Sequence, residues 1–283
     1  MFRPMRVGGQ FYPNTADEAR AVLDDYSHTS EITPEYSRAA IVPHAGWVFS
    51  GPTAYTTLAS LGLLSSARTA VLFGAVHTRG IAKPTLYPDG EWETPFGNVL
   101  IDTEYVKKFR LPSLCATDHL VHIHEHSLEV IVPMLLHINP DLRIIPVSVP
   151  MNDEWNITDY ADLFRAMREN GDCVFIASSD LTHYGYNYGN LSHGVGDEAL
   201  QWVKEEKDPA FLELVYQKKS KELLEYALSH DSACGAGGIA LLTALFHDTE
   251  PVVIDYTTSY DMYPRGGAQS FVSYAGIVFK ETK

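Results

Sequence analysis

Polar residues suited to metal or acid–base chemistry follow three strongly apolar runs of this sequence. The run AAIVP leads directly to His44, and AVLFG leads to His77. The run CVFIASS leads to Asp180 and then to His183. Ligands of open α/β sheets bind beyond the carboxyl ends of the strands, so these side chains would share one crevice. One histidine after a strand is usually structural, but their coincidence predicts a functional site.

Cys234 adds a sulfur to this set of side chains. The stretch DSACGAGG leads straight into the apolar helical pattern of residues 239–246. The positive end of a helix dipole lowers the pKa of a thiol placed there, and small neighbouring residues leave its sulfur accessible. A thiolate can act as a nucleophile or ligate a metal together with imidazoles. The local sequence leaves both uses open, beside that of an inert packed thiol.

A histidine-rich segment, DHLVHIHEHSLE, contributes a further candidate. His126 stands just before a helical pattern, with Glu129 one turn on, and we place it nearest the site. Alternate residues of a loop usually point in different directions, so we expect His119, His122 and His124 to face solvent.

Apolar β-branched runs alternate with helical patterns along the chain. The runs predict strands at residues 39–43, 70–73, 143–149, 173–177, 252–256 and 271–279. The patterns predict helices at residues 19–26, 128–137, 158–170, 208–217, 219–229 and 239–246. This alternation predicts an α/β fold, a three-layer α/β/α sandwich around a mostly parallel or mixed sheet.

Three local signals refine this prediction. Thr15 and Glu18 form a capping-box pattern before the first helix. Pro133 indicates a bend or a late start in the helical pattern around it. The segment 89–102 predicts an irregular excursion with the character of a hairpin or a lid.

Composition limits the class of protein. With 283 residues and no linker or repeat, the chain is predicted to form one domain, 1–283. A formal net charge of −15 makes nucleic acid an unfavourable partner. We find neither a membrane-spanning apolar run nor a secretion signal, and therefore expect a cytoplasmic protein. Three cysteines are too few for a disulfide framework. Cys173 lies in an apolar run and is expected to be a small buried residue of a strand, and we assign no role to Cys115.

Together these motifs resemble the Memo family, whose bacterial and archaeal members are called AmmeMemoRadiSam system protein B. The matching segments are GQFYP at 9–13, PHAGWVFSG at 43–51, GAVH at 74–77, TPFGNV at 94–99, EHSLE at 125–129, SSDLTHYG at 178–185 and CGAGG at 234–238. They span nearly the whole chain in order, and together they are highly specific.

The resemblance implies the fold of the catalytic subunit of class III extradiol dioxygenases, which are non-haem iron enzymes. It implies metal ligands at His44, His77 and Cys234. A cysteine stands here where those dioxygenases have a carboxylate ligand. A thiolate is softer, favours copper, iron or zinc, and would alter oxygen chemistry at iron. Residues 75–78 read AVHT, without the neighbouring second histidine of many family members.

The pocket implied by the resemblance would also hold His126, Asp180 and His183. The expected function is that of a metal-binding redox enzyme or dioxygenase-like protein acting on a small molecule, with Fe(II) first and copper or zinc as alternatives. His183 would act as general acid or base, Asp180 would orient an imidazole, and His126 would position substrate or dioxygen. Phe49, Trp47 and Tyr184 would supply an aromatic wall.

Two other functions use the same pocket. One is a non-catalytic metal- or peptide-binding scaffold in a signalling or modification pathway, with AMMECR-type and radical SAM proteins as partners. The other is a zinc hydrolase with a His/His/Cys centre, in which Asp180 and His183 activate water. A nucleophilic Cys234 with a histidine base is a variant of the last.

Overall fold

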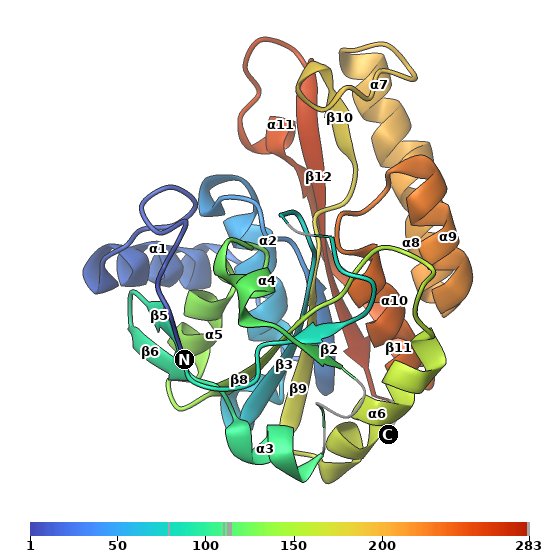
Figure 1. Cartoon of the computed structure of the whole chain (residues 1–283). Coiled ribbons are helices and arrows are strands. Elements are labelled where there is room, and N and C mark those ends of the chain that lie inside the picture. Colours follow the sequence, from blue (N-terminus) through green and yellow to red (C-terminus); the bar gives the residue numbers. More distant parts are fainter. Residues whose placement is uncertain (79, 110, 112–114, 282–283) are drawn as a thin grey trace.

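Four parallel strands form the centre of a large mixed sheet that helices cover on both faces (Figure 1). This computed structural model describes residues 1–78, 80–109, 111 and 115–281. The central strands lie in the order β2 (Ser37–Val42), β9 (Cys173–Ser178), β3 (Thr69–Gly74) and β8 (Arg143–Ser148). They are almost wholly buried, as expected for a sheet between two helical layers. The predicted α/β/α sandwich is confirmed.

Antiparallel neighbours complete this sheet on both sides. On one side β12 (Ser270–Lys280) pairs with β2, and both β11 (Glu250–Thr258) and β10 (His183–Gly185) pair with β12. On the other side β4 (Thr85–Leu86) pairs with β8, and β7 (Ala116–Thr117) pairs with β4. All six predicted strands are confirmed, with ends shifted by one or two residues.

Two groups of helices form the outer layers. One layer holds α1 (Ala16–Thr29), α2 (Trp47–Ser60) and α5 (Val132–Ile138). The opposite layer holds α6 (Ile157–Asn170), α8 (Asp208–Tyr216), α9 (Ser220–His230) and α10 (Ala236–Leu245). Shorter helices are α3 (Thr103–Lys108), α4 (His119–Ile123), α7 (Asp197–Trp202) and α11 (Ser259–Met262), with η1 (Leu64–Ser66), η3 (Tyr186–Tyr188) and η4 (Val203–Lys207).

The segment 89–102 forms a hairpin, as one of its two interpretations predicted. Its strands β5 (Glu91–Thr94) and β6 (Gly97–Leu100) join β1 (Phe2–Arg3) in a small separate sheet. Ile101 forms a bridge with Ile144 of β8. The interpretation as a lid is wrong, because the hairpin packs on the main sheet and does not line the pocket described below.

The sequence signals for helix starts predicted the helices only in part. α5 begins at Val132 with Pro133 in its first turn, the late start that this proline indicated. Thr15 is the N-cap residue of α1, but its hydroxyl donates to the Glu18 carboxylate (2.7 Å) instead of capping the backbone. α2 was missed: it contains Gly51 and Pro52 and is buried on nearly all sides, so it has no amphipathic pattern.

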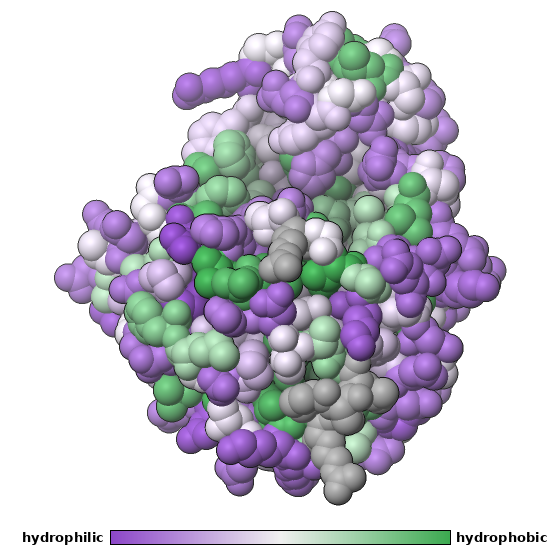
Figure 2. All heavy atoms as spheres, in the orientation of Figure 1, coloured by the Kyte–Doolittle hydropathy of each residue, from purple (hydrophilic) through white to green (hydrophobic). Residues whose placement is uncertain are grey.

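Most of the face in Figure 2 is covered by hydrophilic side chains, with smaller apolar patches between them. None of the helices in the described ranges is both long and apolar enough to cross a membrane.

A buried arginine ties the N-terminal strand to the histidine-rich segment. Arg3 has no exposed surface and stacks on Trp92, 4.4 Å from its guanidinium carbon to the ring centroid. It donates hydrogen bonds to the carbonyls of His122 (2.8 Å) and Glu125 (2.7 Å) and forms an ion pair with Glu129 (2.7 Å). Glu129, one turn beyond His126, therefore belongs to this buried network.

We expect Arg3→Met to lower the free energy of unfolding by roughly 3–5 kcal/mol, because it leaves the buried Glu129 carboxylate without its cation. Urea denaturation followed by circular dichroism measures this change. Arg20→Met is the matched control, since the Arg20 side chain is 54% exposed. A loss below about 1 kcal/mol, the range of exposed ion pairs, would contradict the importance of the buried charge.

Candidate metal centre

Three imidazoles meet beyond the carboxyl ends of the parallel strands. His44 lies two residues after β2, His77 three residues after β3, and His126 comes from the segment before α5. Their ring centroids are 5.3 Å (His44–His77), 5.4 Å (His44–His126) and 4.7 Å (His77–His126) apart. One nitrogen of each ring lies within 4.8 Å of the other two, close enough to surround a metal ion after small adjustments. His44 is buried, while His77 is the most exposed of the three.

Cys234 reaches the same cluster from the start of α10. Its sulfur lies 3.3 Å from Nε2 of His44 and 3.6 Å from the carbonyl oxygen of Asp180. Glycines make this approach feasible. A Cβ at Gly235 would collide with the Ser178 carbonyl and the Ser179 side chain. The small residues around Cys234 therefore let the helix start press against the end of β9 and deliver the sulfur.

A serine fixes the tautomer of His44. The hydroxyl of Ser178 donates to the carbonyl of Ser127 (2.7 Å), so it is an acceptor toward Nδ1 of His44 (3.0 Å). Nδ1 must then carry the proton, and the lone pair of the neutral ring lies on Nε2. This nitrogen faces Cys234. A hydrogen bond of this kind orients an imidazole for a metal.

A buried carboxylate does the same for His77. Glu125 accepts from Nδ1 of His77 (2.9 Å) and from its backbone N–H (2.6 Å), and also from the backbone N–H of Ser127 (3.0 Å). The ring therefore presents Nε2 to the cluster. His126 also lies near this carboxylate, with Nδ1 3.6 Å from Oε1. Glu125 is thus the residue that joins two of the three histidines.

In the part of the chain that the structure describes, the carboxylate of Asp180 binds backbone N–H groups and no imidazole. Its Oδ1 accepts from the N–H groups of His44 (2.7 Å) and Ala45 (3.2 Å), which fixes the loop after β2. Asp180 was expected to orient an imidazole, whereas the hydrogen bonds that orient the rings of His44 and His77 are accepted by Ser178 and Glu125. Both residues were missed. Glu125 lies in the family-like segment EHSLE and Ser178 in SSDLTHYG, but neither segment indicates which side chain would face a histidine.

The cluster opens into a pocket of about 440 Å³. His126, Asp180 and His183 all line it, together with Phe49. Nδ1 of His183 donates to the carbonyl of Leu181 (3.2 Å), which leaves Nε2 as a proton acceptor. The other two residues of the expected aromatic wall are elsewhere. Trp47 and Tyr184 are both fully buried in the core, and neither lines this pocket.

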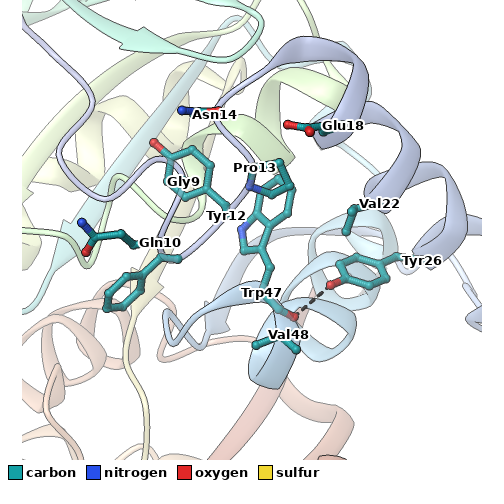
Figure 3. A pocket seen from close by; sticks show the side chains of 11 residues that line it. Gly9, Gln10, Tyr12, Pro13, Asn14, Glu18, Val22, Tyr26, Trp47 and Val48 are labelled. Carbon is teal, nitrogen blue, oxygen red and sulfur yellow. Dashed lines mark hydrogen bonds between the residues drawn. The ribbon is translucent and has the colours of Figure 1, made fainter.

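A larger hollow of about 800 Å³ lies beside it, between the GQFYP segment, α1 and the start of α2 (Figure 3). Tyr26 donates there to the carbonyl of Trp47 (2.8 Å). Its described lining contains Glu18 but no histidine, cysteine or cation. The residues able to bind a metal therefore gather at the smaller pocket.

The histidine-rich segment behaves differently from the expectation in one respect. His124 is exposed and His119 is partly exposed, but His122 is buried. The ring of His122 contacts the Thr85 carbonyl (3.1 Å) and the Ser148 hydroxyl (3.3 Å). Burial lowers its pKa to about 3, so it is a neutral structural residue. The prediction that His122 faces solvent is wrong because α4 turns it inward against β4 and β8.

Opposite charges shift the titration of the cluster. Burial raises the pKa of Cys234, but His44 and His77 outweigh it and bring that pKa down to about 6. Burial lowers the pKa of His77, while its interactions with the anionic Cys234 and Glu125 side chains outweigh burial and raise that pKa to about 10. Burial and the charges of His44 and His77 lower the pKa of His126 to about 4. Without a metal, a thiolate and imidazolium therefore stabilise each other here.

Comparisons with known proteins define the class. A model of the family described as Memo-like protein matches residues 3–278. A MEMO1 family protein of Archaeoglobus fulgidus is 35% identical over 285 residues, covering 98% of this chain and 99% of the relative. A MEMO1 family protein of Pyrococcus abyssi is 33% identical over 300 residues, covering 99% and 100%. The chain belongs to the Memo family, as the motifs indicated.

A solved structure is also similar. The crystal structure of an Escherichia coli K12 protein covers 84% of this chain and 98% of its own, with a TM-score of 0.44 and 15% identity. This similarity supports no statement about function.

In metal-free protein we expect Cys234 to react with iodoacetamide at a rate that rises with pH around a midpoint near 6, because its thiolate forms above that pKa. Mass spectrometry of the alkylated peptides measures the rate. Burial raises the pKa of Cys115 and of Cys173 to about 12, so these two thiols serve as internal controls that stay unmodified in folded protein. A midpoint near 9, the ordinary value for a thiol, would show that the imidazoles do not face the sulfur.

Glu125→Gln should weaken metal binding by about 10- to 100-fold, because the amide is a poorer acceptor for Nδ1 of His77 and the ring loses its orientation. Competition with a chromogenic zinc chelator measures the affinity. Glu104→Gln is the control, since that side chain is 68% exposed and pairs with Arg68 away from the cluster. If both variants bound the metal as tightly as the parent protein, Glu125 would have no role in orienting a metal ligand.

Proposed function

We propose that this protein is a metal-dependent redox enzyme in which His44, His77 and Cys234 hold a transition metal. Fe(II) is the first candidate, and copper or zinc are the alternatives. The substrate would be a small molecule bound in the adjoining pocket. A cytoplasmic location is part of the same proposal.

The paired tautomers of His44 and His77 carry this proposal. Ser178 and Glu125 each accept the Nδ1 proton of one ring, which leaves Nε2 of each ring as the donor to a metal, and Nε2 of His44 lies 3.3 Å from the Cys234 sulfur. Two neutral imidazoles and a thiolate form a donor set suited to iron, copper or zinc and leave a divalent ion with one net positive charge. This set fits the metal that the family resemblance implies. Such a metal supplies Lewis acidity and, for iron or copper, electron transfer to substrate or dioxygen.

His126 is assigned to the substrate side of the centre. It lines the pocket, whereas the other three side chains do not. Its ring stacks on that of His77, with an interplanar angle of 29° and a centroid distance of 4.7 Å, so the two rings lie face to face. Burial and neighbouring charge lower its pKa to about 4, which keeps it neutral and able to accept or donate a hydrogen bond to a bound molecule.

His183 is assigned as the general base. Its Nδ1 donates to the Leu181 carbonyl, which leaves Nε2 as the acceptor, and the residue lines the pocket. Asp180 positions His44 through two backbone hydrogen bonds. In this arrangement Asp180 acts through the loop after β2 and His183 takes a proton from substrate.

The alternative is a non-catalytic protein that binds a metal or a peptide in a modification or signalling pathway, with AMMECR-type and radical SAM proteins as partners. The same three side chains, His44, His77 and Cys234, would then retain a metal without turnover. Oxygen uptake by iron-loaded protein in the presence of reducing substrates distinguishes the two functions. A third candidate, a zinc hydrolase, would show hydrolysis that chelation abolishes and iron does not support.

Elemental analysis of anaerobically purified variants tests the ligand assignment. His44→Ala and Cys234→Ala should lose the metal, because each removes one of three donors. His126→Ala should keep the metal and lose turnover, since its role is to contact the substrate. His119→Ala is the control for removal of a histidine outside the centre.

Stoichiometric metal in both His44→Ala and Cys234→Ala would contradict the proposal. Loss of metal from His126→Ala, with retention in Cys234→Ala, would instead assign a three-histidine site.

A further inference from the structure

Paired rings form the walls of the pocket beside the metal centre. The pairs are Phe11 with His126, His183 with Tyr188, and Phe49 with Tyr263, at centroid distances of 5.0, 5.0 and 5.7 Å. The last two are near-perpendicular, at 83° and 75°. All six residues line the pocket, and Phe49, Tyr188 and Tyr263 are also exposed to solvent at 37%, 47% and 44%. Ring faces and edges of this kind favour a planar ligand.

Among the described residues that line this pocket, Arg265 is the only arginine or lysine. It stands on a turn, in which its N–H donates to the carbonyl of Tyr263 (2.8 Å) and in which Gly266 and Gly267 both have positive φ (72° and 74°). In the described part of the chain no carboxylate forms an ion pair with Arg265. An unpaired guanidinium is therefore available to a ligand.

Acidic side chains outnumber basic ones in this chain, 36 to 21. The whole chain carries a formal net charge of −15, which repels anions from most of its surface. The pocket has one carboxylate, Asp180, whose Oδ1 accepts two backbone hydrogen bonds. Arg265 thus provides a local cation where an anionic group can bind, and guanidinium binds carboxylate through two parallel hydrogen bonds.

We propose that this pocket binds a small aromatic acid. Its ring lies between the aromatic walls, its carboxylate pairs with Arg265, and the far end of the ring faces His126. A volume of about 440 Å³ is within the range of small-molecule sites, and a single-ring acid fits it. This inference rests on the proposed function, because it names the class of substrate that the metal centre would act on.

Isothermal titration calorimetry at low salt, with the protein as purified, tests the two parts of the inference. The probes are benzoate, benzamide, which has the same shape without charge, and cyclohexanecarboxylate, which has the same charge without a flat ring. We expect benzoate to bind about ten-fold more tightly than either of the other two, because it alone satisfies both the guanidinium and the ring walls.

Arg265→Gln separates Arg265 from the metal as the partner of the carboxylate. It should weaken benzoate by about ten-fold and leave benzamide unchanged. Arg20→Gln, an exposed arginine on α1, should change neither. An unchanged benzoate affinity in Arg265→Gln would show that the carboxylate binds elsewhere, for example on the metal. Equal affinities for cyclohexanecarboxylate and benzoate would overturn the preference for a flat aromatic ring.

Metal content measured on the same samples separates this inference from the proposed function. If the protein retains metal through His44 and Cys234 but none of the probes binds, the substrate class is wrong while the metal centre stands. If benzoate binds through Arg265 while His44→Ala and Cys234→Ala keep their metal, the proposed function fails and the acid-binding pocket stands.

Discussion

The contact between the Cys234 sulfur and Nε2 of His44, at 3.3 Å, is the interaction on which the rest of the centre depends. It joins residues 190 positions apart and requires the start of α10 to press against the ends of the parallel strands. Gly235 permits this approach at β9, and Gly237 permits it beside the Pro150 carbonyl, which follows β8. A side chain at either position would push the helix away and withdraw the sulfur. The sheet therefore positions the cluster, because the ends of its parallel strands fix the loops that carry the histidines and the start of α10 that carries Cys234.

Charge balance explains how this cluster is tolerated without a metal. A buried thiolate alone would cost several kcal/mol, but two imidazoles beside it share the compensating charge. Glu125 adds a second anion, and burial is again outweighed: its contacts with His77 bring its pKa down to about 2. A divalent ion that replaces the proton on His77 keeps the same sign of charge at the same place. Under the proposed ligand assignment, metal binding would therefore be coupled to proton release.

The sequence allowed much of this architecture to be predicted. The four central strands were found because apolar residues run continuously through a doubly covered sheet, whereas β11, which is only partly buried, was found from its β-branched run. The loops after β2, β3 and β9 were correctly expected to meet, because parallel strands end at one edge. His44, His77 and Cys234 were then identified from residue type and from the family resemblance, and their roles as ligands stay a prediction.

Other features depend on tertiary contacts that no local pattern encodes. α2 is buried on most sides and contains Pro52, so neither amphipathic spacing nor propensity marked it. The roles of Glu125 and Ser178 follow from which imidazole each one faces. His122 and His126 are four residues apart in one segment, yet one packs against Thr85 and the other lines the pocket. Such differences arise only when α4 docks on the sheet.

X-ray absorption spectroscopy at the zinc edge of zinc-loaded protein tests the central claim most directly. Zinc is redox-silent and reports the donor set by bond length. Our account predicts one sulfur scatterer at about 2.3 Å together with imidazole nitrogens at about 2.0 Å. A first shell of nitrogen and oxygen alone, with no sulfur, would contradict the convergence of Cys234 with the two histidines.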